Sequence, residues 1–159
     1  MKIAIACDHG GYLLKQDILI WLEEHGIDYE DFGCYSTESV DYPVFAEKAA
    51  RAVADGACDK GIVICTTGIG VSIAANKVKG IRCALCTDSL QAEMTRRHND
   101  ANMMALGAGI TGGNLAKRMV EIFLNQVRHP RRADGDGARR VQGDDLRLPC
   151  ALQGGGGFK

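Results

Sequence analysis

The sequence Gly61-Ile62-Val63-Ile64-Cys65-Thr66-Thr67-Gly68-Ile69-Gly70-Val71-Ser72 joins an apolar run to a glycine-rich turn. Residues 61–65 have the continuous apolar character of a strand that is buried on both faces of a parallel sheet. The apolar periodicity of residues 69–78 predicts a helix that begins directly after the turn. Together these predictions put Cys65 at the carboxyl end of a strand, facing the backbone N–H groups of a helix start.

That position favours a functional cysteine. Ligands of open α/β sheets bind at the carboxyl ends of the strands, and N–H groups at a helix start attract anions and stabilise a thiolate. The same spacing also fits a buried structural cysteine followed by an ordinary tight turn. The stretch alone leaves both interpretations open.

Strands and helices alternate along the chain on both sides of this stretch. We expect strands at residues 2–7, 27–32, 61–65, 81–86 and 103–106, and helices at residues 12–25, 43–54, 69–78, 88–98 and 114–127. Such alternation is typical of right-handed crossovers and of a parallel sheet with helices on both faces. The predicted fold class is α/β, and the order of the strands stays open.

The composition limits the classes of function. The chain has 159 residues, 46% of them hydrophobic, which is enough for one domain with a sizeable core. Its 19 basic and 20 acidic residues argue against a domain-wide basic surface for nucleic acid. No apolar run approaches the ~20 residues of a membrane span, and the chain begins with a strand-like segment rather than a signal peptide. We therefore expect a cytoplasmic protein, without nucleic-acid or membrane partners, whose seven cysteines are free thiols.

The apolar periodicity stops after residue 127. The next segment is basic from Arg128 to Arg132, and a glycine run extends from Gly154 to Gly157. We therefore divide the chain into one folded domain, residues 1–127, and an atypical tail, residues 128–159, that is first basic and then glycine-rich. We expect this tail to be mobile.

Three turns carry side chains that can move protons. Asp8 and His9 follow the first predicted strand, Cys65 and Thr67 follow the third, and His98-Asn99-Asp100 precedes the fifth. We expect these turns at one edge of the sheet, where an acid, two imidazoles, a thiol and a hydroxyl suit proton transfer on a small polar substrate. A single histidine or aspartate at a turn is more often a helix cap, so the prediction depends on their convergence.

Two other patterns suggest different chemistry. Residues 107–112, Gly-Ala-Gly-Ile-Thr-Gly, match the dinucleotide fingerprint G-x-G-x-x-G between a strand and a helix. They follow the last strand, and no later strand supplies an acidic residue for a ribose, so a tight turn with close packing is the alternative. Cys83 and Cys86 form a C-x-x-C inside a predicted strand, without the second Cys/His pair of a zinc site. We expect no metal.

Several short motifs occur in order along the chain. They are Cys7-Asp8-His9-Gly10-Gly11, Asp41-Tyr42-Pro43, Cys65-Thr66-Thr67-Gly68-Ile69-Gly70, Ala74-Ala75-Asn76-Lys77 and His98-Asn99-Asp100-Ala101-Asn102. With them the chain, from Lys2 to about Leu124, resembles type B ribose-5-phosphate isomerase. This family also contains galactose-6-phosphate isomerase subunits and allose-6-phosphate isomerases. The resemblance implies a Rossmann-like, three-layer α/β/α sandwich with a five-stranded parallel sheet.

The resemblance also implies an activity. It is that of an aldose–ketose isomerase, without metal or cofactor, that interconverts ribose 5-phosphate and ribulose 5-phosphate through a cis-enediolate. The implied roles are Cys65 as the base, Asp8 and His98 in ring opening, Thr67 in moving hydroxyl protons, the N–H groups of Gly68, Ile69 and Gly70 at the enediolate oxygen, and His9, Asn99 and Tyr42 as substrate contacts. A galactose- or allose-6-phosphate isomerase is the alternative within the family, and a nucleotide-binding module is the alternative outside it.

The family's sites are shared between subunits, and here the phosphate site departs from the family pattern. The resemblance implies a homodimer or tetramer in which His98 and Asn99 reach into the neighbouring subunit's site. Many members have an arginine for the phosphate in the turn after strand five, where this chain reads Gly107-Ala108-Gly109. Arg128 and Arg132 are the expected phosphate ligands by residue type. A basic flexible tail, or a non-catalytic paralogue with a degraded phosphate site, is the alternative.

Overall fold

The computed structural model of the chain describes residues 1–126. Within this range the elements are β1 (Lys2–Cys7), the 3-10 turn η1 (His9–Gly11), α1 (Tyr12–Glu24), β2 (Asp28–Asp31), α2 (Tyr42–Ala54), β3 (Lys60–Cys65), α3 (Ile69–Ala75), β4 (Cys83–Leu85), α4 (Ser89–Arg97), β5 (Met103–Gly107) and α5 (Gly113–Asn125). The predicted alternation of strands and helices is confirmed. Among these residues no helix combines the length and the apolar character needed to cross a membrane.

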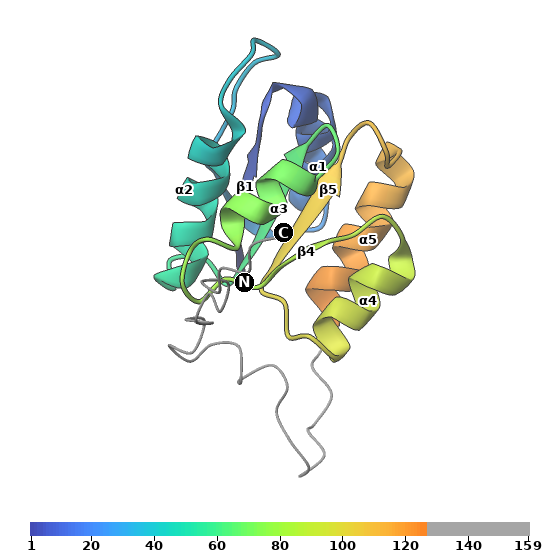
Figure 1. The fold of residues 1–159 in the computed structure, drawn as a ribbon. Coiled ribbons are helices and arrows are strands. Elements are labelled where there is room, and N and C mark those ends of the chain that lie inside the picture. Colours follow the sequence, from blue (N-terminus) through green and yellow to red (C-terminus); the bar gives the residue numbers. More distant parts are fainter. Residues whose placement is uncertain (127–159) are drawn as a thin grey trace, which may run out of the picture. The chain divides into compact units, whose positions relative to one another are not determined.

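The five strands of the described range form one parallel sheet in the order β2-β1-β3-β5-β4. Helices α2 and α3 pack on one face, and α1, α4 and α5 pack on the other (Figure 1). The α/β class and the three-layer sandwich are therefore confirmed. The chain moves one way along the sheet after β1 and β4 and the opposite way after β2 and β3, so right-handed crossovers put α1 and α4 on one face and α2 and α3 on the other.

The reversal of direction lies between β1 and β3. The chain leaves β1 toward one edge of the sheet and leaves β3 toward the other edge. In open α/β sheets such a reversal opens a crevice at the carboxyl ends of the two strands, and ligands bind there. The topology alone therefore predicts a ligand site at the turns that follow Cys7 and Cys65.

The two faces of the sheet carry side chains of different size. In β1, Ile3 and Ile5 belong to the core beneath α1, α4 and α5, whereas Ala4 and Ala6 belong to the core beneath α2 and α3. All four are completely buried. The small side chains let the alanine-rich face of α2 approach the sheet closely, and Cys65 belongs to this second core.

Helix α3 and strand β4 differ most from their predicted lengths, and both are shorter. Helix α3 ends at Ala75 rather than at residue 78, and the Asn76 side chain takes over the contacts there. Its Nδ2 donates to the carbonyls of Ser72 at 2.9 Å and Cys83 at 2.8 Å, and its Oδ1 accepts from the Cys83 N–H at 2.9 Å. Strand β4 covers only Cys83–Leu85, because it is an edge strand that pairs with β5 alone.

Candidate active site

Cys65 ends β3, and its thiol lies against the turn that follows. The Sγ atom accepts a hydrogen bond from the Gly68 N–H at 3.0 Å, and the residue is 6% exposed. N–H donors at a helix start are among the features that stabilise a thiolate in proteins. The predicted place of Cys65, at the carboxyl end of a central strand beside the start of α3, is confirmed.

The turn between Cys65 and α3 requires a glycine. Gly68 has a φ of +77°, in the left-handed region, and an added Cβ would lie 2.5 Å from the Leu85 side chain. The exposed Thr67 lies within this turn, residues 66–68, which we call the cysteine turn, and its Oγ1 accepts from the Ile69 N–H at 3.4 Å. The Gly68 and Ile69 amides therefore both bond to side chains of the turn itself.

The turn after β5 packs against the cysteine turn. The Gly109 N–H donates to the Thr66 carbonyl at 2.8 Å. A Cβ on Gly107 would lie 2.6 Å from the Thr67 carbonyl oxygen, so only glycine permits this approach. Gly107 and Gly109 of the G-x-G-x-x-G pattern thus bring two turns together, which is the packing role that we weighed against dinucleotide binding.

Asp8 lies at the same edge of the sheet as Cys65. The parallel register pairs Cys7 with Ile64, and the Asp8 N–H donates to the Ile64 carbonyl at 3.0 Å. The residue is 7% exposed, and its Oδ1 caps η1 by accepting from the Gly11 N–H at 3.0 Å. The carboxylate is therefore a cap, and the cap fixes it at the strand end next to β3.

His9 and Tyr42 complete this edge. The Val40 N–H donates to His9 Nδ1 at 3.3 Å, so the proton of the neutral ring belongs on Nε2. Tyr42 begins α2, and a Cβ on Gly70 would lie 2.9 Å from its ring. The first turns of α2 and α3 therefore meet at Tyr42, on the face of the sheet to which Cys65 belongs.

The third predicted turn lies at the opposite edge of the sheet. Strands β3 and β5 are parallel, with Gly61 opposite Met103 and Cys65 opposite Gly107, so His98-Asn99-Asp100 is near the amino ends of the strands. Figure 1 shows the α4–β5 connection at the lower end of β5 and the start of α3 toward its upper end. Our prediction of one shared edge within the chain is wrong. Helix α4 starts at the carboxyl edge and returns, so its last residues reach the amino edge.

The backbone of this distant turn is held from several sides. Asp100 has a φ of +51°, a left-handed conformation that aspartate adopts more readily than most residues. Arg82 Nε donates to the Asn99 carbonyl at 2.7 Å, and the Arg96 guanidinium donates to the Ala101 carbonyl. His98 and Asn99 themselves are exposed. Both residues lie at the opposite edge of the sheet from Cys65 of their own chain.

The remaining predictions concern phosphate, metal and thiols. Arg128 and Arg132 lie outside the described residues. Within residues 1–126, no group of three or more His, Cys, Asp or Glu side chains could hold a metal ion. Burial raises the pKa of both Cys83 and Cys86 to about 12, so this C-x-x-C consists of neutral thiols at physiological pH.

Most of the sequence matches the model of a protein family. The sequence model described as ribose/galactose isomerase matches residues 3–142. The chain belongs to the ribose/galactose isomerase family. The match extends beyond residue 126, the last described residue, and into the segment that contains Arg128 and Arg132.

Several members of this isomerase family are close to the chain. Ribose-5-phosphate isomerase B of Escherichia coli K12 is 47% identical over 123 residues, which are 77% of this chain and 83% of the relative. A galactose-6-phosphate isomerase subunit LacB of Clostridium acetobutylicum is 39% identical over 130 residues, 82% of this chain and 75% of the relative. The solved ribose-5-phosphate isomerase B of Clostridium thermocellum has a TM-score of 0.82 and 49% identity, covering 89% of this chain and 93% of its own.

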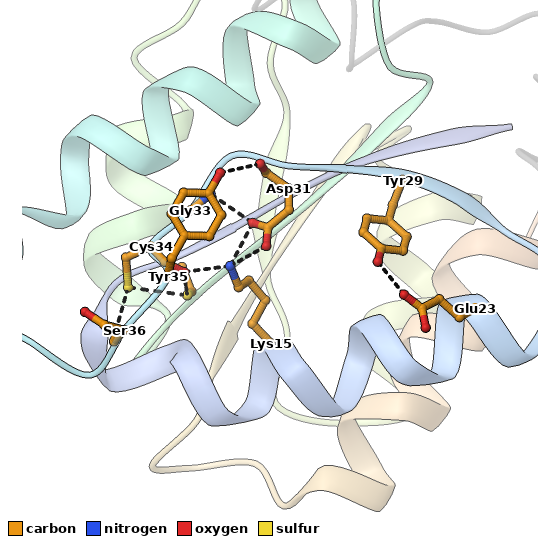
Figure 2. Close-up of polar contacts among 9 residues, drawn as sticks. Lys15, Glu23, Tyr29, Asp31, Gly33, Cys34, Tyr35 and Ser36 are labelled. Carbon is orange, nitrogen blue, oxygen red and sulfur yellow. Dashed lines mark hydrogen bonds and ion pairs between the residues drawn. The ribbon is translucent and has the colours of Figure 1, made fainter.

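Sequence reasoning missed one polar cluster of this isomerase. Lys15 is completely buried beneath the loop between β2 and α2, where it binds Asp31 (Figure 2). A signal was present, because Lys15 follows Leu14 and precedes Ile18 and Leu19 on the apolar stripe of a predicted helix. A lysine inside such a stripe needs a buried partner.

Proposed function

We propose that this isomerase interconverts ribose 5-phosphate and ribulose 5-phosphate through a cis-enediolate, with Cys65 as the base. The observation that carries the proposal is the hydrogen bond from the Gly68 N–H to the Cys65 sulfur, at the strand end where the sheet changes direction. The relatives named ribose-5-phosphate isomerase B support the five-carbon substrate, at 47% identity in sequence and 49% in the solved structure.

The reaction moves a proton between the C1 and C2 carbons of the open-chain sugar. A proton next to a carbonyl is weakly acidic, so its removal requires an oriented base and donors for the negative charge that grows on the oxygen. In our proposal the Cys65 thiolate accepts the proton, and backbone N–H groups at Gly68–Gly70 stabilise the enediolate oxygen. A single preorganised donor of this kind is typically worth about 3–4 kcal/mol.

The neighbouring side chains have supporting roles in this proposal. Asp8, fixed by its cap to Gly11, assists opening of the furanose ring. His9 accepts at Nδ1 from Val40, which leaves Nε2–H to donate to a substrate hydroxyl or phosphate. The Thr67 hydroxyl relays hydroxyl protons, and Tyr42 lines the side of the site at α2.

A second copy of the chain supplies what this edge lacks. We propose a homodimer, alone or paired into a tetramer, in which His98 and Asn99 of one subunit enter the site of the other. Two observations support this arrangement. His98 and Cys65 of one chain are separated by the length of the strands, and apolar side chains of α3 are exposed on the side of the site where Tyr42 lies. Ile69 and Ile73 of α3 are 52% and 55% exposed, as expected of a surface that another subunit covers.

We also propose that Arg128 and Arg132 bind the phosphate, because guanidinium groups match phosphate oxygens in a bidentate geometry. Free thiols at all six described cysteines are consistent with a cytoplasmic location.

The test is an isomerase assay on the full chain. We expect formation of ribulose 5-phosphate from ribose 5-phosphate, and a loss of about 10²-fold or more in kcat for Cys65→Ala, as is usual for a positioned base. Cys58→Ala, which changes a buried thiol outside this edge, is the matched control and should keep its activity. Undiminished turnover by Cys65→Ala would exclude Cys65 as the base.

A six-carbon substrate is the second candidate, because LacB of Clostridium acetobutylicum is 39% identical. Parallel assays with galactose 6-phosphate and allose 6-phosphate distinguish the two. A kcat/KM for either that exceeds the value for ribose 5-phosphate would replace the five-carbon assignment.

A further inference from the structure

The most completely buried charge of the described chain belongs to Lys15 in α1. Its side chain is 0% exposed, and its Nζ lies 2.7 Å from both carboxylate oxygens of Asp31 and 2.7 Å from the Cys34 carbonyl oxygen (Figure 2). The same ammonium group lies 5.0 Å from the centroid of the Tyr35 ring. The amine thus bonds to the end of β2 and to the loop that follows it.

The partners of Lys15 fix the start of that loop. Asp31 Oδ1 accepts from the Gly33 N–H at 2.9 Å, and the Tyr35 hydroxyl donates to the Asp31 carbonyl at 2.8 Å. The Cys34 N–H donates to the Cys7 carbonyl at 2.8 Å, which joins the loop to the end of β1, one residue before Asp8. The start of the loop is therefore bonded to the end of β1, next to Asp8, the proposed acid.

The other end of the loop reaches the site directly. Residues 33–41 contain neither helix nor strand. Near its end the Val40 N–H binds the His9 ring, and two residues later Tyr42 lies against Gly70. A segment without regular structure depends on such contacts for its shape, so the bonds at Lys15 and Asp31 hold one end of the loop whose other end contacts His9 and leads into Tyr42.

Stability alone does not account for a charged pair at this position. Burying an ammonium group is costly, and apolar side chains of similar volume often stabilise a core equally well or better. Leu14, Ile18 and Leu19 show that the surrounding stripe accepts such side chains. What an apolar residue would lack is the set of directional bonds to Asp31 and Cys34.

We propose that Lys15 and Asp31 are a positioning pair for substrate binding, acting through the 33–41 loop on His9 and Tyr42. This inference rests on the proposed function, because it assigns those two residues to the substrate. The pair touches no reacting atom, so its loss should weaken substrate binding more than it slows the chemical step.

The test compares the double variant Lys15→Met/Asp31→Asn, which removes both charges, with the native protein. We expect a folded protein whose KM for ribose 5-phosphate rises roughly tenfold while kcat changes about twofold or less, since small misplacements of binding groups have effects of this size. Lys2→Met is the control, because Lys2 of β1 forms a half-exposed ion pair at 2.5 Å with Glu30 of β2, the strand that also carries Asp31. Its KM should not change.

A second measurement separates positioning from general destabilisation. We therefore introduce Lys15→Met/Asp31→Asn into the His9→Ala variant. If the pair acts through His9, the rise in KM should be smaller there than in the native protein, because the effects of coupled residues do not add. A purely structural effect would raise KM by the same factor in both proteins. Where the double variant fails to fold, Tyr35→Phe removes one bond to Asp31 from an exposed side chain and should raise KM in the same direction. A native KM in a folded Lys15→Met/Asp31→Asn protein would overturn the proposal.

Hydrogen exchange tests the positioning pair without relying on the proposed reaction. The amides of residues 33–42 should exchange faster in Lys15→Met/Asp31→Asn, and those of β3 should not. This readout needs no substrate. Faster exchange in a protein that proves inactive on ribose 5-phosphate would reject the proposed reaction alone, and unchanged exchange would reject the positioning pair.

Discussion

At the scale of single residues, the site depends on where side chains are absent as much as on where they are present. Gly68 provides the left-handed turn that brings an N–H to the Cys65 sulfur, and Gly107 lets a neighbouring backbone approach. The sequence alone predicted the place of Cys65 at the end of a strand and before a helix start, because an apolar run preceded the glycine turn, but it left open whether the thiol is functional. It could not reveal that the Asp8 carboxylate accepts a hydrogen bond from the Gly11 N–H, since that bond depends on the three-dimensional path of the turn.

The contact between Gly70 and Tyr42 leads to a prediction. A Cβ at Gly70 would lie 2.9–3.3 Å from three atoms of the Tyr42 ring, so Gly70→Ala should push the ring away from the site. We expect a higher KM and no loss of thermal stability, because alanine is preferred to glycine within a helix by about 0.5–1 kcal/mol. Steady-state kinetics and a melting curve measure both.

The control for this substitution is the Tyr42→Ala background. There the added methyl group has no ring to contact. The KM of the double variant Gly70→Ala/Tyr42→Ala should therefore equal the KM of Tyr42→Ala. An equal rise in both backgrounds would show that the methyl group acts on the substrate or the turn rather than through Tyr42.

At the scale of elements, the pattern of apolar residues predicted the helices and strands well, and their ends less well. Helix α3 stops early because Asn76 bonds to Cys83 of β4, a partner seven residues away that no periodicity indicates. The partner of the buried Lys15 was unpredictable in the same way, since Asp31 lies in another element. Contacts between elements, rather than propensities within them, account for these differences.

Lys60 joins two elements and should make their stability depend on pH. It starts β3, and its Nζ donates to the carbonyls of Phe123 and Leu124 at the end of α5, at 3.1 Å and 2.8 Å. Burial, and secondarily the charge of Arg96, lowers its pKa from 10.5 to about 8. Between these two values the unfolded chain binds more protons at Lys60 than the folded protein does. The contribution of Lys60 to the free energy of unfolding therefore rises with pH.

Urea unfolding of the native protein and of Lys60→Met tests this sign. The free energy of unfolding of the native protein relative to the variant should increase by about 1–2 kcal/mol between about pH 7.5 and pH 9.5. The buried thiols have the opposite effect, since burial raises the pKa of Cys7 to about 12, but both proteins contain them and the difference cancels their contribution. A difference that stays constant or falls with pH would contradict the lowered pKa.

At the scale of the whole molecule, the sheet separates two groups of side chains that the proposed reaction needs together. Cys65 and Asp8 lie at the carboxyl edge, whereas the turn with His98 lies at the amino edge. Counting strands and helices could have predicted this separation, because a helix that returns from the carboxyl edge must end at the amino edge. The order of the strands could not be predicted, since crossovers of similar length reach either neighbour.

Subunit complementation tests whether two chains build each site. Cys65→Ala and His98→Ala should each be inactive as homodimers, but a mixed dimer contains one site with Cys65 from one chain and His98 from the other. Random mixing of equal amounts makes half of the dimers mixed, each with one intact site, so about a quarter of the native activity should return. Cys65→Ala mixed with Asp8→Ala is the control and should stay inactive, because both residues belong to the same edge of one chain. If native mass spectrometry detects mixed dimers of Cys65→Ala and His98→Ala and no activity returns, His98 does not act across the subunit boundary.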